Sequence, residues 1–213
     1  MILLLLGPPG SGKGTQAKKL SAEHGWPQLS TGDMLRSAIA RGTSLGERAK
    51  TYMDQGALVP DEVVIGLIEE RIKEKDCTQG FILDGFPRNV AQAEELDRML
   101  GRQGRRLDQV VLFEISDPEL IERLSGRRTC EKCSSMYHLL HSMPRQDQVC
   151  DQCHGRLLQR SDDQPDVIRR RLGVYHQQTE PLVGFYRGQK KLVSLDARVS
   201  PSAVAEALNQ SLN

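Results

Sequence analysis

The 213-residue sequence predicts an α/β fold with a parallel β-sheet flanked by helices. Two observations predict this fold. Short apolar runs typical of buried strands recur along the chain, and helical patterns separate them, as in βαβ units. A chain of this length buries about two-thirds of its unfolded surface, so we expect a single core.

Four strands and one helix can be predicted from the apolar pattern. The strands are expected at Ile2–Leu6, Phe81–Asp84, Val110–Ile115 and Lys191–Leu195. A helix is expected at residues 61–72, where apolar side chains share one helical face: Val63, Val64, Leu67, Ile68 and Ile72. Asp61 follows Pro60 and is expected to cap this helix.

Two segments interrupt the alternation of strands and helices. Residues 30–59 read as a small helical insert, and residues 127–163 are polar and hold four of the five cysteines. The second segment has too few apolar residues for a core of its own, so a bound metal would explain how it folds. We therefore expect a core formed by residues 1–29, 60–126 and 164–213, with two inserts at residues 30–59 and 127–163.

The charge balance gives no support to binding of a large polyanion such as a nucleic acid or an anionic membrane surface. The chain has 29 lysines and arginines against 28 acidic residues, a net charge of +1, so non-specific binding to nucleic acid or a membrane surface is not expected. The first apolar run is too short for a signal-peptide core, and no later run approaches the ~18 residues of a membrane-spanning helix. We expect a soluble protein of the cytoplasm.

A glycine-rich loop follows the first predicted strand. The segment GPPGSGKGT (residues 7–15) places four glycines around Lys13 and Thr15, and a helix is expected to start near Lys13. Glycines let backbone N–H groups approach an anion closely, the helix N-terminus is positive, and Lys13 adds a charge, so the loop is predicted to bind phosphate. Gly14 separates Lys13 from Thr15, and this GKGT ending resembles the loop of nucleoside monophosphate kinases.

Asp84 and a set of arginines complete the predicted phosphate chemistry. Asp84 ends a predicted strand, so it should lie at the carboxyl edge of the sheet beside the loop, where it can hold Mg²⁺ through water. Phosphoryl transfer needs charge compensation more than covalent chemistry. Arginines that recur beside glycine-rich or acidic motifs are the candidates: Arg36, Arg88, Arg123, Arg127, Arg160 and Arg171.

Nearly the whole chain resembles adenylate kinases of the bacterial type with a long lid. The matching segments are GPPGSGKGTQA, STGDMLR, LVPDEV, LDGFPR with Gln92, GRR, and RSDDQPDVIRRRL followed by YH. The resemblance implies the fold of a nucleoside monophosphate kinase, with a five-stranded parallel sheet, a nucleoside monophosphate (NMP)-binding insert at residues 30–59 and a metal-binding lid at residues 127–163. It also implies Mg²⁺-dependent transfer of phosphate from ATP to AMP, giving ADP.

The resemblance also implies a role for individual residues. The ATP site would contain Gly10, Ser11, Gly12, Lys13, Gly14, Thr15, Arg123, Arg127, Met136, Tyr137 and Val199. The AMP site would contain Thr31, Arg36, Ala57, Leu58, Val59, Gly85, Phe86, Pro87, Arg88, Gln92, Arg160 and Arg171. The catalytic groups would be Lys13, Arg88, Arg127, Arg160 and Arg171, with Asp162 and Asp163 in the lid hinge.

The acceptor base has two candidate interpretations. Gln92 offers an amide that can give and take hydrogen bonds at an adenine edge. Asn89 completes GFPRN, which also resembles pyrimidine monophosphate kinases, but their lids are short and this one is long, so adenine is predicted. No general base is expected, because an AMP phosphate oxygen is already anionic at neutral pH.

The cysteine spacing predicts a structural metal site. Cys130 and Cys133 precede Cys150 and Cys153 by sixteen residues, which matches a four-thiolate zinc site. Co²⁺ or Fe²⁺ could take the same site, two disulfides are the alternative, and one of His138, His141 and His154 could replace a cysteine. Cys77 is expected to be a buried or half-buried thiol without a reactive role.

A second functional hypothesis is a phosphate-loop switch or nucleic-acid module whose zinc ribbon is the binding surface. Against it, Tyr137 is the one aromatic residue of the second insert, and acidic residues dilute its charge. We expect ATP, AMP and ADP as partners, no nucleic acid, no membrane, and a monomer.

Overall fold

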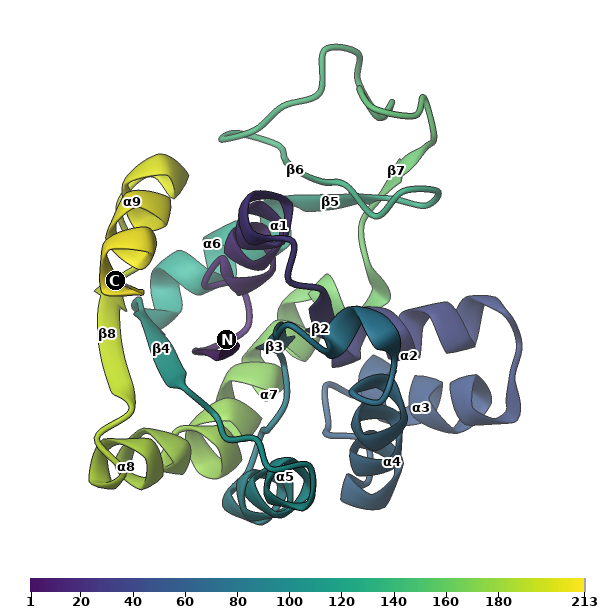
Figure 1. The fold of residues 1–213 in the computed structure, drawn as a ribbon. Helices are drawn as coiled ribbons and strands as arrows, with labels where there is room; N and C mark the ends of the chain where they lie inside the picture. The colour runs from purple at the N-terminus through teal and green to yellow at the C-terminus, as the bar shows by residue number, and fades with distance from the viewer. Residues whose placement is uncertain (213) are drawn as a thin grey trace.

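A five-stranded parallel sheet forms the centre of the chain (Figure 1) in a computed structural model that describes residues 1–212. The strand order is β2–β3–β1–β4–β8, and every neighbouring pair is parallel. The strands are β1 (Ile2–Leu6), β2 (Gln28–Ser30), β3 (Phe81–Asp84), β4 (Gln109–Glu114) and β8 (Leu192–Asp196). The predicted fold class is confirmed, and the ends of β4 and β8 differ from the expected ones by one residue.

Strand β2 was not found from the apolar pattern. It has three residues, and Leu29, its one apolar residue, lies between Gln28 and Ser30, so no apolar run marks it. The strand exists because it pairs with β3, with Leu29 opposite Leu83. This pairing brings the start of the first insert to the carboxyl edge of the sheet.

Helices cover both faces of the sheet. They are α1 (Lys13–His24), α2 (Thr31–Ala40), α3 (Ser44–Asp54), α4 (Asp61–Arg71), α5 (Val90–Arg102), α6 (Asp117–Gly126), α7 (Pro165–Val174), α8 (Pro181–Gly188) and α9 (Pro201–Ser211), with a short 3₁₀ turn η1 at Lys75–Cys77. Alternate residues of β1 face opposite sides. Leu4 packs in the cluster of α4, α5 and α8, whereas Leu3 and Leu5 pack with α1 and α9. The central strand is therefore apolar throughout.

The two predicted inserts have different structures. Residues 30–59 hold α2 and α3, and residues 127–163 hold a small antiparallel sheet of order β6–β5–β7 followed by a 3₁₀ turn, η2. In Figure 1 the small sheet lies above the main sheet, and α2 and α3 lie to the right of the main sheet. Its elements are β5 (Arg127–Cys130), β6 (Met136–His138), β7 (Leu157–Leu158) and η2 (Ser161–Asp163).

The predicted cap of α4 is wrong. Pro60 occupies the N-cap position, and no side chain caps the helix. The carboxylate of Asp61 instead accepts hydrogen bonds from Asn89 Nδ2 at 3.0 Å and from Gln92 Nε2 at 2.7 Å. Two amide donors at the start of α5 therefore take the acceptor that the helix N-terminus would otherwise use.

Helices α7 and α8 are joined by a π-helical turn, η3 (Tyr175–Thr179), so residues 165–188 form one interrupted helical stretch. Within residues 1–212, no helix has the length and apolar character needed to cross a lipid bilayer.

Candidate functional site

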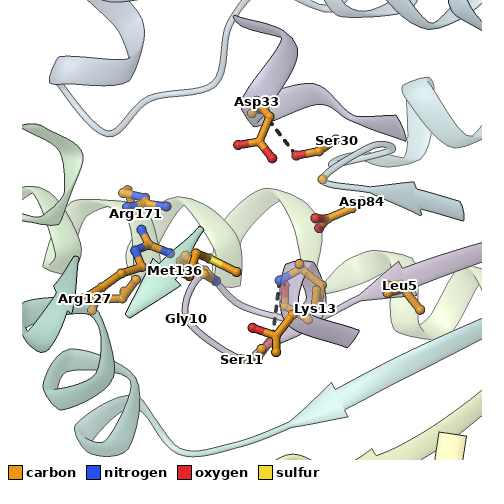
Figure 2. A pocket seen from close by; sticks show the side chains of 18 of the residues that line it. Leu5, Gly10, Ser11, Lys13, Ser30, Asp33, Asp84, Arg127, Met136 and Arg171 are labelled. Carbon is orange, nitrogen blue, oxygen red and sulfur yellow. Dashed lines mark hydrogen bonds between the residues drawn. The ribbon is translucent and has the colours of Figure 1, made fainter. Parts of the chain in front are cut away.

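A cavity of about 730 Å³ lies where the carboxyl edge of the sheet meets both inserts. Its walls come from the glycine-rich loop, the end of β3, α2 with the segment after α3, the lid strands and α7. Figure 2 shows Lys13 and Asp84 on one side of this space and Arg127 and Arg171 on another. Crevices at this edge of α/β sheets are where ligands bind.

The glycine-rich loop has the geometry that the sequence predicted. Gly10 and Gly12 have φ angles of 87° and 95°, a region that residues with side chains rarely adopt. A Cβ on Gly10 would lie 2.8 Å from Leu124 Cγ, so a larger residue would also clash there. Helix α1 begins at Lys13, and no side chain caps it, so the first N–H groups of the helix have no partner within it. The loop can therefore hold an anion.

The ammonium of Lys13 is held by the loop itself. Lys13 Nζ donates to the carbonyl oxygens of Gly7 at 2.7 Å and Pro8 at 2.8 Å, and to Ser11 Oγ at 3.3 Å. Burial lowers the pKa of Lys13 to about 8, even though the Asp84 carboxylate acts in the opposite direction. The phosphate of a ligand would raise this pKa again, because it stabilises the charged form.

The arginines of the cavity are crowded and buried. The pKa of Arg88 is lowered to about 10, mainly by burial and also by repulsion from the neighbouring Arg171. The pKa of Arg160 is also lowered to about 10, mainly by burial and then by repulsion from Arg127. Both groups stay charged at neutral pH, so the cavity has an excess of positive charge that a polyphosphate would compensate.

Asp163 pairs with two of these arginines. Its carboxylate is fully buried, accepts from Arg127 Nε at 2.7 Å, and lies 3.1 Å from Arg171 Nη1. Asp162 Oδ2 also lies 3.1 Å from Arg171 Nη1. The family resemblance implied that both aspartates lie in the hinge of the lid. Nothing in the sequence indicated that they would pair with the arginines.

At the other end of the cavity, hydrogen bonds fix the amide of Gln92. Its Oε1 accepts from the Arg88 N–H at 2.7 Å, and its Nε2 donates to Asp61. A backbone N–H can only donate and a carboxylate can only accept, so the amide has one orientation. Thr31 Oγ1 donates to the Gly85 carbonyl at 2.8 Å.

The residues predicted for nucleotide binding line this cavity, with one exception. The side chain of Phe86 is fully buried in the main hydrophobic cluster and does not line it. Phe86 is large and apolar, so it packs into the core, and only its backbone remains to contact a ligand. Tyr137 borders the cavity, but its hydroxyl accepts from the Asp151 N–H at 2.8 Å within the lid.

Among the lining residues that were not predicted, three are polar side chains that contact the predicted site. Gln28 Nε2 donates to Asp84 Oδ2 at 2.8 Å, Asp33 pairs with Arg36 at 2.6 Å, and Thr179 Oγ1 donates to the backbone carbonyl of Arg88 at 2.7 Å. Asp33 stands in STGDMLR beside Arg36, and this spacing could have indicated the pair. Nothing in the local sequence marks Gln28.

Asp84 is suited to the predicted Mg²⁺ role. It ends β3 and lines the cavity, and a Cβ placed on Gly14 would lie 3.3 Å from its Oδ2. An acidic oxygen beside the phosphate loop is the donor type that Mg²⁺ prefers, through water or directly.

The four lid cysteines lie together as the spacing predicted. Their Sγ atoms are within 4.8 Å of one another, with Cys130 and Cys153 at 3.4 Å and Cys133 and Cys150 at 3.5 Å. Disulfide sulfurs would be about 2.05 Å apart, whereas thiolates around one tetrahedral ion with bonds of about 2.3 Å are roughly 3.8 Å apart. The cluster therefore fits a metal ion and not two disulfides.

The three histidines considered as ligands lie outside the metal cluster that the described residues form. His138 Nδ1 instead accepts from the N–H groups of Leu140 and His141. Cys77 is a fully buried free thiol, and burial raises its pKa to about 11.

Comparisons with known proteins identify the family of the chain. A sequence model of the family described as adenylate kinase matches residues 5–191. The adenylate kinase of Archaeoglobus fulgidus is 53% identical over 196 residues, covering 92% of this chain and 90% of its own. That of Syntrophobacter fumaroxidans is 53% identical with 96% of each chain covered, and that of Syntrophotalea carbinolica is 50% identical over 212 residues. Because this similarity spans both inserts and the phosphate loop, the chain belongs to the adenylate kinase family.

Proposed function

We propose that the residues of the basic cavity divide between two nucleotides, ATP at the glycine-rich loop and AMP at the first insert. The chain is a phosphotransferase that converts ATP and AMP reversibly to two ADP. The observation that supports the division is the excess of buried cations between the two ends of one cavity.

At the ATP end, the loop and the lid would act together. Lys13 and the N–H groups at the start of α1 would hold the β- and γ-phosphates, and Arg127 would reach them from the lid. Arg123 Nη1 donates to the Ala197 carbonyl at 2.9 Å, which keeps its guanidinium beside a residue that is close in sequence to Val199, another residue of the ATP set. The full ATP set is Gly10, Ser11, Gly12, Lys13, Gly14, Thr15, Arg123, Arg127, Met136, Tyr137 and Val199.

At the AMP end, Arg36 and Arg88 would hold the phosphate, and Gln92 would contact the base. The fixed amide of Gln92 keeps one N–H and one oxygen lone pair for a ligand after its bonds to Asp61 and Arg88. The full AMP set is Thr31, Arg36, Ala57, Leu58, Val59, Gly85, Phe86 through its backbone, Pro87, Arg88, Gln92, Arg160 and Arg171.

The transfer itself would proceed without a general base. An AMP phosphate oxygen forms a bond to the γ-phosphorus of ATP, the bond from that phosphorus to the β–γ bridging oxygen breaks, and ADP leaves with that oxygen. Lys13, Arg88, Arg127, Arg160 and Arg171 would hold the two phosphate chains in line and compensate their repulsion. Asp84 would hold the Mg²⁺ that accompanies ATP, and that ion would supply further charge compensation. Excluding water would prevent hydrolysis of ATP.

We also propose that the two inserts move against the core (residues 1–29, 60–126 and 164–213). The proposed boundaries of the second insert coincide with element ends, because α6 ends at Gly126 and η2 ends at Asp163, whereas the first insert begins at the last residue of β2. Ser161 Oγ donates to Asp54 Oδ1 at 2.9 Å, which links residues 127–163 to residues 30–59. This contact supports closure of both inserts over bound nucleotides.

The lid cluster is proposed to hold Zn²⁺, with Co²⁺ or Fe²⁺ as alternatives. Four thiolates leave no open coordination position, so the metal would stabilise the lid and take no part in transfer. Cys150→Ser is expected to abolish stoichiometric metal binding and lower the melting temperature by several degrees, because the lid has few apolar contacts of its own. Metal analysis and calorimetry of the purified protein would measure both.

His154→Asn is the matched control for Cys150→Ser. His154 is exposed and has a φ of 56°, which asparagine tolerates. It should keep the metal content and melting temperature of the parent. Full metal content in Cys150→Ser would contradict the assignment of four cysteine ligands.

We further propose a monomer in the cytoplasm with no nucleic-acid partner. Four free cysteines in a metal-binding arrangement suit a reducing compartment, and the net charge of +1 gives no general attraction to polyanions. The family match favours the kinase over the alternative of a switch or nucleic-acid module.

The acceptor assignment is tested by phosphoryl transfer from MgATP to AMP, GMP, CMP and UMP under identical conditions. AMP is expected to be the best acceptor, because the amide of Gln92 has a fixed orientation at the base site. A higher kcat/KM with CMP or UMP would contradict the adenine assignment and support the pyrimidine alternative suggested by Asn89.

A further inference from the structure

The π-helical turn η3 is an uncommon feature that the reaction described above does not use. The Glu180 N–H donates to the Tyr175 carbonyl at 2.9 Å, one residue further back than in an α-helix. Pro181 follows directly, and proline has no N–H and clashes with the carbonyl four residues earlier in an α-helix. The wider turn relieves this clash, and turns of this kind are frequent at functional sites.

The turn directs Thr179 towards Arg88. Thr179 is 6% exposed and lines the nucleotide cavity. Its hydroxyl donates to the Arg88 carbonyl at 2.7 Å, although the two residues are 91 positions apart. On the other side, the Arg88 N–H donates to Gln92. Side chains therefore hold both backbone polar groups of Arg88.

Arg88 has no support for its backbone from regular secondary structure. It lies between β3 and α5, outside any strand, so no sheet ladder holds its backbone. Its guanidinium donates to the Gly85 carbonyl at 2.7 Å and is close enough to Arg171 for the two charges to repel each other. A mobile backbone would let the guanidinium leave the cavity.

The turn is itself fixed to the rest of the molecule. His176 Nε2 lies 3.0 Å from Asp117 of α6, and its Nδ1 lies 3.0 Å from Glu180. Arg171 lies on α7, within the same helical stretch. One stretch of helix therefore carries Arg171 and also contacts the backbone of Arg88.

We propose that Thr179 is a positioning residue for phosphoryl transfer, whose hydroxyl holds the Arg88 backbone so that the Arg88 guanidinium stays in the cavity beside Arg171. The inference rests on the proposed role of Arg88 at the AMP phosphate. Thr179 itself contacts no reacting atom; it acts through Arg88.

Thr179→Val tests this role, because valine keeps the shape of threonine and removes the donor. It is expected to lower kcat/KM for AMP by about 10- to 100-fold, the range for a misplaced catalytic group, with little change in KM for MgATP. Thr179→Ser, which keeps the hydroxyl, should restore most of the loss. Thr78→Val is the matched control, because the exposed Thr78 hydroxyl also donates to a carbonyl at 2.7 Å, far from the cavity.

The outcomes separate this inference from the proposed function. An unchanged kcat/KM for AMP in Thr179→Val, or no recovery in Thr179→Ser, would overturn the positioning role. If Arg88→Ala loses activity while Thr179→Val keeps it, the role of Arg88 stands and only the present inference fails. If Arg88→Ala keeps its activity, the role of Arg88 fails as well. Melting curves establish that each variant is folded, and Thr179→Ala replaces the valine variant if that one does not fold.

Discussion

Replacing Arg88 with alanine is expected to lower kcat/KM for AMP by about 10³-fold or more without unfolding the chain. The guanidinium would contact the phosphates directly, and transfer in this site depends on positioned charge because no residue provides covalent catalysis. A loss of this size corresponds to about 4 kcal/mol of transition-state stabilisation. Steady-state kinetics with varied AMP at saturating MgATP would measure it.

The fold should tolerate this change for a physical reason. Burial and the neighbouring Arg171 lower the pKa of Arg88, so in the absence of nucleotide its positive charge reduces the free energy of unfolding. Alanine removes the charge and leaves the backbone bonds to Gln92 and Thr179 in place. The melting temperature without nucleotide should therefore equal or exceed that of the parent.

Arg98→Ala is the control for Arg88→Ala. Arg98 lies on α5, is 61% exposed and pairs with Glu95 at the surface, so its loss should change neither activity nor folding. Activity of Arg88→Ala within about tenfold of the parent, a loss of only ~1.4 kcal/mol, would contradict the role of Arg88.

Asp163→Asn is expected to destabilise the chain by about 3 kcal/mol or more, the usual cost of breaking a buried ion pair by removing one partner. Asp163 is fully buried between Arg127 and Arg171. Asparagine would leave both guanidinium groups without their shared negative partner. For a chain of this size, the melting temperature should fall by roughly 6–12 °C, which calorimetry would detect.

Asp166→Asn is the matched control, since Asp166 is 84% exposed and pairs with Arg169 at 3.0 Å on the surface of α7. Exposed ion pairs of this kind contribute ~1 kcal/mol or less. A melting temperature of Asp163→Asn that differs from that of Asp166→Asn by less than about 2 °C would mean that the arginines do not depend on Asp163 for their compensation.

The phosphate loop and the metal cluster could be predicted from the sequence because their chemistry is local. The glycines and Lys13 lie within one turn between a strand and a helix, and each CxxC pair lies within one tight turn. In both cases a few neighbouring residues determine the geometry. Four of the five strands could also be predicted: β1, β3 and β4 are buried on both faces and therefore apolar along most of their length, and β8 is a partly buried edge strand with three apolar residues.

Other parts of the site depend on contacts between segments that are distant in the sequence. Strand β2 forms because β3 lies beside it. The Asp61 carboxylate, at the first residue of α4, does not cap that helix because Asn89 and Gln92 of the α5 start donate to it. Phe86 belongs to a motif that predicts AMP binding, yet its side chain packs in the core. Residue propensities and motif spacing predict the local structure of one segment, and they do not predict contacts between distant segments.

The sequence by itself determined the α/β class, the phosphate loop, the four-cysteine cluster and the arginines that surround the cavity, because each follows from residue type and local spacing. Only the tertiary structure decided how those arginines are held. Asp163 joins Arg127 to Arg171, and Thr179 reaches the backbone of Arg88 across 91 positions of the chain. These partners meet because α7 packs against α6 and continues into the π-helical turn, and no local pattern encodes that packing.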